Sequence, residues 1–370
     1  MKYYIISGEA SGDLHASNLM RSLKQEDSEM EVRAWGGDLM EAQGATLVKH
    51  YKELAFMGFL EVVMNLRIIL NNLAFCKKDV LEFQPDLLIL VDYPGFNMRM
   101  AKFAKQHNIP VYYYVSPQVW AWKKNRVYDI KKYVTKLYAI LPFEKDFYKQ
   151  FDYEVEYLGH PLLDAVLNYK NELKVEANQW KQEGRPLIAL LPGSREQELN
   201  KMLLKMIEVE KQFPDCDFVI AGVDALGKDF YHSLLKHSNI RVVFNKTYEL
   251  FDEADAALVS SGTATLETAL FNVPQVVCYQ TSWFSFKIAQ LLVAIKYISL
   301  VNLISDKEVV KELIQDDLTV ANMVAELKKI LSPAHKTHML HQYAELRTLL
   351  GGEGASERVA KSIYKHISNY

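Results

Sequence analysis

A serine and an arginine stand together where an apolar run gives way to a helical pattern, in IALLPGSREQEL (residues 188–199). The run breaks at Pro192-Gly193, and Ser194 and Arg195 open the expected helix. Unpaired backbone N–H groups at a helix start, a hydroxyl and a guanidinium together favour an anion, above all phosphate. A serine N-cap beside an arginine that pairs with a nearby glutamate would have the same sequence. This stretch by itself leaves both interpretations open.

A second turn of the same kind occurs in VSSGTATLE (residues 259–267). Ser261, Gly262 and Thr263 stand at a helix start, where unpaired N–H groups and the positive dipole end favour phosphate. Glu267 lies one turn further along and could reach a ribose diol; the alternative is a threonine N-cap with a solvent-facing glutamate. Two such turns in one half of the chain suggest a nucleotide diphosphate. Neither matches G-x-G-x-x-G, so a dinucleotide is not favoured.

The elements that position these turns follow from the apolar periodicity. Short apolar runs alternate with helical patterns, which predicts βαβ units and parallel sheets, an α/β fold. Strands are expected at residues 3–7, 32–35, 87–91, 111–115 and 137–140, and again at 187–191, 218–221, 242–244, 257–259 and 275–278. Polar stretches follow several of them, among them SGEASGD after the first strand and VDYPGFN at Asp92. Ligands of such folds bind at the carboxyl ends of the strands, so chemistry should lie there.

A polar stretch without a strand pattern (residues 159–186) separates the two runs of strands. It predicts two Rossmann-like, doubly wound domains, residues 1–163 and 164–350, which face one another across an interdomain cleft. Whether a helix at about 351–370 packs back on the first domain is left open.

Composition excludes several classes of protein. A net charge of −3 argues against a nucleic-acid partner, and three widely spaced cysteines form neither a disulfide framework nor a zinc site. Asp-Cys-Asp at 215–217 precedes a strand and predicts a turn, while His335, His338 and His341 fit a solvated helix face, so no metal site is expected.

The first strand begins at once, without the apolar core of a signal peptide, and no run is long enough to span a membrane. A reducing, cytoplasmic location follows.

Five segments resemble one family, the lipid-A-disaccharide synthases: SGEASGDLHASNL, VSPQVWAW, LGHPLLD, LLPGSREQEL and SSGTATLE. The resemblance runs in order along residues 3–315, with YISLVNLI and VVKELIQ extending it, and is weak beyond. It implies the glycosyltransferase-B fold. The implied reaction, which needs no cofactor, transfers 2,3-diacylglucosamine from its UDP derivative to 2,3-diacylglucosamine 1-phosphate. A β-1,6 disaccharide forms with inversion, and UDP leaves.

The resemblance and the residue patterns assign the same roles. The UDP diphosphate would be held by Gly193, Ser194, Arg195, Ser261, Gly262 and Thr263, and the ribose by Glu267. Arg195 and a helix N-terminus would neutralise the leaving group without a metal. Asp92, in the opposite domain, would be the general base for the acceptor 6-hydroxyl, with Glu9 and Asp13 as rivals. Further substrate contacts are implied at Ser11, Asn97, Gln118 and Asn302.

Two positions depart from the family pattern. Gly95 replaces a residue that is usually acidic, which concentrates the base on Asp92 while leaving its two rivals open. Ala16 stands where the family often has glycine, a smaller change.

An acylated substrate calls for a membrane-facing surface, and residues 59–75 offer one. As a helix, this segment has one core-facing stripe that includes Leu70 and Leu73, and a second apolar row of Leu60, Met64 and Ile68. The second row is either deeply buried or faces lipid, and the acylated substrate favours lipid. We therefore expect peripheral association with the inner membrane surface.

Alternatives remain at this point. Another UDP-N-acetylglucosamine-using transferase or epimerase of the same fold would turn over a soluble sugar. A non-catalytic nucleotide-sugar-binding module would bind UDP without turnover. A homodimer is one of the oligomeric states that the sequence leaves open.

Overall fold

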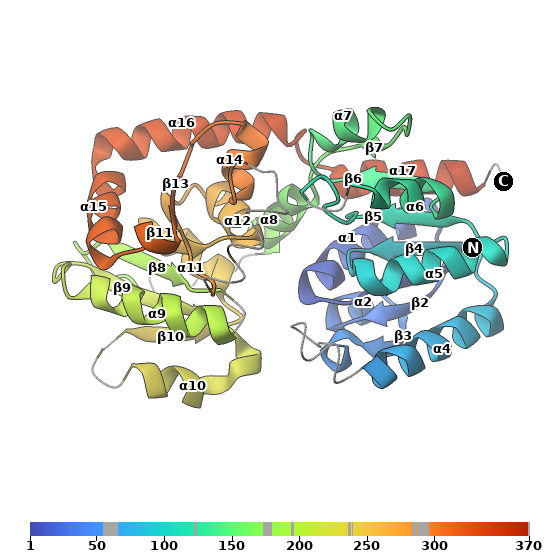
Figure 1. The fold of residues 1–370 in the computed structure, drawn as a ribbon, viewed down its shortest axis with the longest axis horizontal. Coiled ribbons are helices and arrows are strands. Elements are labelled where there is room, and N and C mark those ends of the chain that lie inside the picture. The colour runs from blue at the N-terminus through green and yellow to red at the C-terminus, as the bar shows by residue number, and fades with distance from the viewer. Residues whose placement is uncertain are drawn as a thin grey trace. The chain divides into compact units, whose positions relative to one another are not determined.

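The computed structural model describes residues 1–54, 66–121, 124–172, 180–193, 196–235, 238, 240–282, 286 and 296–368 (Figure 1). The chain forms two compact units. Unit 1 comprises Met1–Leu167 together with Leu350–Tyr370, and unit 2 comprises Asn168–Leu349. The chain therefore leaves unit 1 four residues after the boundary expected from the sequence, and it returns at Leu350.

Unit 1 is built on a seven-stranded parallel sheet with the order β3-β2-β1-β4-β5-β6-β7. Its strands are β1 (Lys2–Ser7), β2 (Glu31–Gly36), β3 (Thr46–His50), β4 (Leu87–Val91), β5 (Val111–Tyr114), β6 (Lys136–Ala139) and β7 (Glu156–Tyr157). The strand order reverses between β1 and β4, where Ser7 pairs with Val91. Such a reversal is where open α/β sheets bind ligands, and the residues after β1 and β4 emerge there.

Helices cover both faces of this sheet because its central strands are apolar on both sides. On one face, α4 (Leu66–Phe83), α5 (Pro94–Gln106), α6 (Arg126–Tyr133) and α7 (Glu144–Lys149) supply core residues beside the sheet. On the other, α1 (Ala10–Glu26), α2 (Asp38–Ala42) and α17 (Ala355–Ile367) do so. The 3₁₀ turn η1 (Tyr51–Glu53) follows β3.

The returning C-terminal segment is an integral part of unit 1. Helix α17 packs against α1, and its residues Val359, Ala360 and Ile363 belong to the core. Asp164, in α8 (Pro161–Glu172), accepts hydrogen bonds from the N–H groups of Gly354 and Ser356, each at 2.6 Å, and so holds the start of α17.

Unit 2 is built on a six-stranded parallel sheet with the order β10-β9-β8-β11-β12-β13. Its strands are β8 (Leu187–Leu191), β9 (Asp217–Gly222), β10 (Arg241–Phe244), β11 (Ala256–Ser260), β12 (Gln275–Tyr279) and β13 (Lys311–Ile314). Around it lie α9 (Glu196–Glu210), α10 (Gly227–Leu234), α11 (Thr247–Glu253), α12 (Thr263–Leu270), α14 (Leu300–Ser305), α15 (Val320–Leu331) and α16 (Pro333–Leu349), with 3₁₀ turns η2 (Asp224–Leu226) and η3 (Gln315–Asp317). The α/β class predicted from the sequence is confirmed, although β3, β7 and β13 were not anticipated.

Within the described part of the chain, no helix is long and apolar enough to cross a membrane.

Candidate active site

The two turns proposed to bind phosphate follow neighbouring strands of unit 2. Strands β8 and β11 pair directly, with Val259 opposite Leu191. Gly193 has φ +103°, and a Cβ atom there would lie 3.2 Å from the Ser260 Oγ. Glycine therefore permits both the backbone conformation and the close approach of the two turns. Ser194 and Arg195 lie outside the described residues.

The start of α12 leaves its backbone donors without a side-chain cap. Gly262 is the N-cap residue, with φ 139°, and no side chain forms a cap hydrogen bond there. Thr263 is exposed and is the first helical residue, so the alternative of a threonine N-cap is not what the structure shows. Ser261 donates its hydroxyl to the Ile298 carbonyl at 2.9 Å. The open N–H groups of this helix start suit an anion.

Glu267 projects from the same helix and is only partly exposed, unlike the solvent-facing glutamate of the alternative interpretation. Its Oε1 accepts a hydrogen bond from the Tyr248 hydroxyl at 2.8 Å. Burial raises the pKa of Glu267, while the Tyr248 hydrogen bond opposes the rise. A carboxylate held in this way is a suitable acceptor for a ribose hydroxyl.

In unit 1, Asp92 directly follows β4 in a constrained backbone. Asp92 and Tyr93 have φ +48° and +49°, a left-handed conformation that is unusual outside glycine. The Asp92 carbonyl accepts hydrogen bonds from the Asn97 Nδ2 and from the Tyr113 hydroxyl, both at 2.7 Å. A Cβ atom on Gly8 would lie 2.3 Å from the Tyr93 ring, so the chain after β1 approaches this turn closely. Backbone strain held by surrounding contacts is typical of functional positions.

The electrostatic surroundings of Asp92 suit a general base. Burial and, next, the negative charge of Glu9 raise the pKa of Asp92 to about 6, while a hydrogen bond from the Tyr93 N–H opposes the rise. A base is most effective when its pKa is near the working pH and it is still ionised. Glu9 itself is exposed, at the N-cap position of α1.

Asp13, the second rival, has a structural role. Its buried carboxylate accepts hydrogen bonds from the N–H groups of Gly37 at 2.8 Å, Leu39 at 3.1 Å and Met40 at 3.2 Å. It therefore caps α2 from a different helix. Burial raises the pKa of Asp13, and these backbone hydrogen bonds lower it.

Two asparagines predicted to contact substrate are fully buried. The Asn97 Nδ2 donates to the carbonyls of Ile6, Val91 and Asp92, so this side chain holds the backbone beneath Asp92. Of the other residues implied to contact substrate, Ser11 is partly exposed in the first turn of α1, and Gln118 is exposed after β5. Both are accessible to a ligand.

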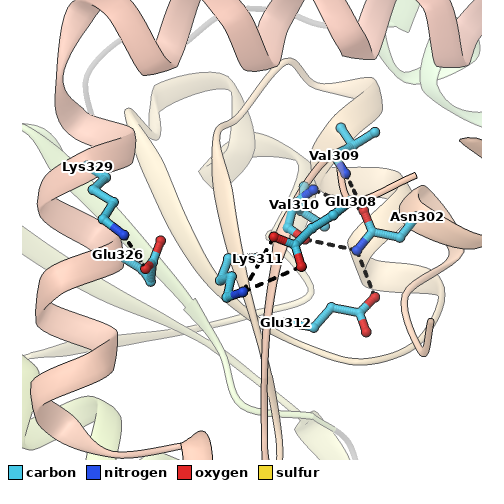
Figure 2. Close-up of polar contacts among 8 residues, drawn as sticks. All are labelled: Asn302, Glu308, Val309, Val310, Lys311, Glu312, Glu326 and Lys329. Carbon is cyan, nitrogen blue, oxygen red and sulfur yellow. Dashed lines mark hydrogen bonds and ion pairs between the residues drawn. The ribbon is translucent and has the colours of Figure 1, made fainter. Parts of the chain in front are cut away.

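Asn302 is the second of these asparagines (Figure 2). Its Nδ2 donates to the Val310 carbonyl at 2.8 Å and to the Glu312 Oε1 at 2.9 Å. Its Oδ1 accepts from the N–H groups of Val309 at 2.7 Å and Val310 at 3.0 Å. All four hydrogen-bonding positions of the amide are thus used within unit 2, so Asn302 links α14 to β13. A contact of Asn302 with substrate stays a prediction.

The predicted membrane helix is only partly described, because Leu60 and Met64 lie outside the described residues. Ile68, the third residue of that row, is 45% exposed in α4. Leu73 is buried as expected, but Leu70 is 53% exposed, so its assignment to the core-facing stripe was wrong. Helix α4 therefore presents apolar side chains to solvent.

No group of three or more His, Cys, Asp or Glu residues gathers in the described ranges as a metal site would require. His335, His338 and His341 are exposed on α16.

A family model for lipid-A-disaccharide synthetase matches residues 3–366. The chain belongs to this family. The lipid-A-disaccharide synthase of Syntrophus aciditrophicus is 36% identical over 364 residues, which cover 96% of this chain and 95% of that one. The enzyme of the same name from Coxiella burnetii (strain CbuG_Q212) is 35% identical over 370 residues, 98% of each chain.

Solved structures confirm the two-domain α/β fold that was expected for this chain. The UDP-GlcNAc 2-epimerase of Neisseria meningitidis, bound to UDP-GlcNAc, superposes with a TM-score of 0.72 at 14% identity, over 99% of this chain and 100% of that one. A glycotransferase of kitacinnamycin gives a TM-score of 0.65 at 15% identity, over 98% of each chain. At such identities, the likeness concerns the fold alone.

Sequence reasoning missed two residues that hold the site. Tyr113, in the neighbouring strand, donates a hydrogen bond to the Asp92 carbonyl. Glu312 accepts one from the N–H of Ile298, the residue whose carbonyl bonds the Ser261 hydroxyl. Tyr113 lies within a run of three tyrosines, whose pattern does not distinguish it. For Glu312, the sequence did contain a signal. A carboxylate within a strand, as in KELI, becomes partly buried and then needs hydrogen-bond donors.

Proposed function

We propose that the chain transfers 2,3-diacylglucosamine from its UDP derivative to 2,3-diacylglucosamine 1-phosphate, forming the β-1,6 disaccharide 1-phosphate and UDP with inversion. Membership of the family along nearly the whole chain carries this proposal. The alternative of an epimerase rests on fold likeness alone and is not favoured.

Unit 2 binds the donor. Gly193, Ser194, Ser261, Gly262 and Thr263 hold the diphosphate, and the uncapped start of α12 supports that role. Arg195 neutralises charge as UDP leaves, and Glu267 holds the ribose. Preorganised donors aimed at the leaving group stabilise charge that develops in the transition state.

Asp92 removes the proton from the acceptor 6-hydroxyl as that oxygen attacks the anomeric carbon of the donor. Its raised pKa and partly buried position support this assignment. Asn97 and Tyr113 fix its backbone, and Ser11 and Gln118 contact the acceptor. Attack from the face opposite the leaving UDP produces the inversion.

The proposed function is tested by supplying both diacylated substrates in detergent, with EDTA present, and following the disaccharide 1-phosphate by mass spectrometry. Product and UDP in equal amounts are expected. Turnover of unacylated UDP-N-acetylglucosamine in preference to the acylated donor would favour the alternative enzyme, and UDP binding without product would favour a binding module. Activity that EDTA abolishes and Mg²⁺ restores would contradict the metal-independent mechanism.

The pH profile should show the titration of Asp92. Because the base must be ionised, and its pKa is about 6, kcat/KM should fall below that pH, about tenfold per unit. Glu9→Gln removes a negative charge that raises this pKa, so the acidic limb should move to lower pH. A limb that Asp92→Asn leaves in place would belong to another group.

We also propose that the protein associates peripherally with the cytoplasmic face of the inner membrane, through Leu60, Met64 and Ile68. The exposure of Ile68 supports this surface. Changing all three to serine should release the protein from vesicles of anionic phospholipid in a flotation assay, with UDP affinity retained. Leu204→Ser, at an apolar side chain of unit 2 that is 48% exposed, is the matched control. Unfolding of the triple variant would place these side chains in the core. We propose in addition that the chain forms a homodimer, which light scattering would detect as a particle of twice the chain mass.

A further inference from the structure

The carboxylate of Glu312 gathers the segment that leads into α14. Its Oε1 accepts hydrogen bonds from the Ser299 N–H at 3.0 Å, the Ser299 hydroxyl at 2.7 Å and the Asn302 Nδ2 at 2.9 Å. Its Oε2 accepts from the Ile298 N–H at 3.0 Å. Ser299 and Asn302 are fully buried, so one carboxylate satisfies donors that would otherwise be costly.

The two carboxylate oxygens serve different parts of this segment. Oε1 accepts from Ser299, the N-cap of α14, and from Asn302 within that helix. Figure 2 shows Asn302 beside Val309, Val310 and Glu312. Oε2 holds the peptide of Ile298, on the other side of the N-cap. The two oxygens therefore hold the peptide groups on either side of Ile298, and Oε1 also anchors the start of α14.

Ile298 connects Glu312 to the donor site. Its carbonyl accepts the Ser261 hydroxyl at 2.9 Å, and Ser261 precedes the N-cap of α12. Both carboxylate oxygens thus hold the backbone around the Ile298 carbonyl, Oε2 through the Ile298 N–H and Oε1 through the Ser299 N–H, which belongs to the same peptide group as that carbonyl. These hydrogen bonds link Glu312 to the turn that we assign to the diphosphate. A side chain on the edge strand β13 can in this way set the orientation of the Ser261 hydroxyl.

We propose that Glu312 is a positioning residue for the nucleotide site, acting through the Ile298 backbone on Ser261. The proposal rests on the proposed function, because it takes Ser261 and the start of α12 to bind the UDP diphosphate. Glu312 itself touches no substrate. It orders the turn before the ligand arrives, which lowers the cost of binding.

Glu312→Gln disrupts the Oε2 contact with the Ile298 N–H and leaves the Oε1 contacts in place. The amide oxygen can keep the three donors on Oε1, but its NH₂ group then faces the Ile298 N–H, donor against donor. The dissociation constant of UDP, measured by calorimetry, should rise about fivefold or more, the scale of one lost hydrogen bond. In turnover, KM for the UDP donor should rise more than kcat falls.

Ser299→Ala is the matched control. It removes a hydroxyl that bonds Glu312 and caps α14, yet it leaves the contact between Glu312 and Ile298 intact. It should lower the melting temperature without weakening UDP binding. If both variants lose stability and neither changes the UDP dissociation constant, Glu312 is structural only and the proposal fails.

Ser261→Ala separates the proposal from the donor-site assignment. If Glu312 acts through Ser261, the double variant should bind UDP no more weakly than Ser261→Ala alone, a non-additive result. Ser261→Ala that weakens UDP while Glu312→Gln does not would overturn the role of Glu312. Ser261→Ala with unchanged UDP affinity would instead overturn the assignment of Ser261 to the diphosphate. Should Glu312→Gln fail to fold, Glu312→Asp, which keeps both oxygens on a shorter side chain, is subject to the same comparison.

Discussion

The Asp92→Asn variant is expected to turn over ~10²–10⁴-fold more slowly than the wild-type protein, the usual contribution of a general base. A primary hydroxyl is a poor nucleophile until its proton is being accepted, and asparagine keeps the size of aspartate but cannot accept that proton. The Asp92 carbonyl, which Asn97 and Tyr113 hold, is unchanged by the substitution. Folding and UDP affinity should therefore persist, and the loss should appear in kcat and kcat/KM together.

The rival carboxylates provide the controls for this prediction. Glu9→Gln should retain most activity near neutral pH, because Glu9 acts on Asp92 only through its charge. Asp13→Asn should lower the free energy of unfolding by about 1–3 kcal/mol, since it disturbs a carboxylate that accepts three backbone hydrogen bonds. An Asp92→Asn variant that stays active, beside a folded but inactive Glu9 or Asp13 variant, would move the base to the loop after β1.

Arg195→Ala is expected to weaken UDP binding by roughly 1.5–3 kcal/mol, the scale of a hydrogen bond to a charged group. Turnover should fall further than affinity, because negative charge on the leaving diphosphate grows in the transition state. Calorimetry with UDP and steady-state kinetics with the acylated donor separate the two effects.

Arg185→Ala is the matched control, at the opposite end of β8. The Arg185 guanidinium pairs with Asp217 at 2.8 Å and donates to the carbonyls of Pro214 and Cys216. Its loss should reduce stability and leave UDP affinity unchanged. If Arg195→Ala also leaves UDP affinity unchanged, Arg195 pairs with a neighbouring glutamate, and the phosphate interpretation of its turn is wrong.

The sequence by itself determined the features that depend on local pattern. Apolar runs of strand length, separated by helical periodicity, predicted parallel sheets in two units. The glycines at 193 and 262 marked turns whose backbone other residues rarely adopt, and both have positive φ. Strands β3 (TLVKH) and β13 (KELI) were not predicted because polar side chains interrupt their apolar residues, and β7 has only two residues, too few for a periodic signal.

Only the tertiary structure decided how the polar side chains divide between chemistry and scaffold. Asp13 and Asp92 look alike in the sequence, each beside a predicted strand end. The Asp13 carboxylate accepts hydrogen bonds from backbone N–H groups 24 to 27 residues away, whereas burial and the negative charge of Glu9 raise the pKa of Asp92. Asn302 and Glu312 likewise gain their partners only when β13 packs beside α14. A side chain's role depends on which distant backbone groups it must satisfy once water is excluded, and local sequence does not encode those partners.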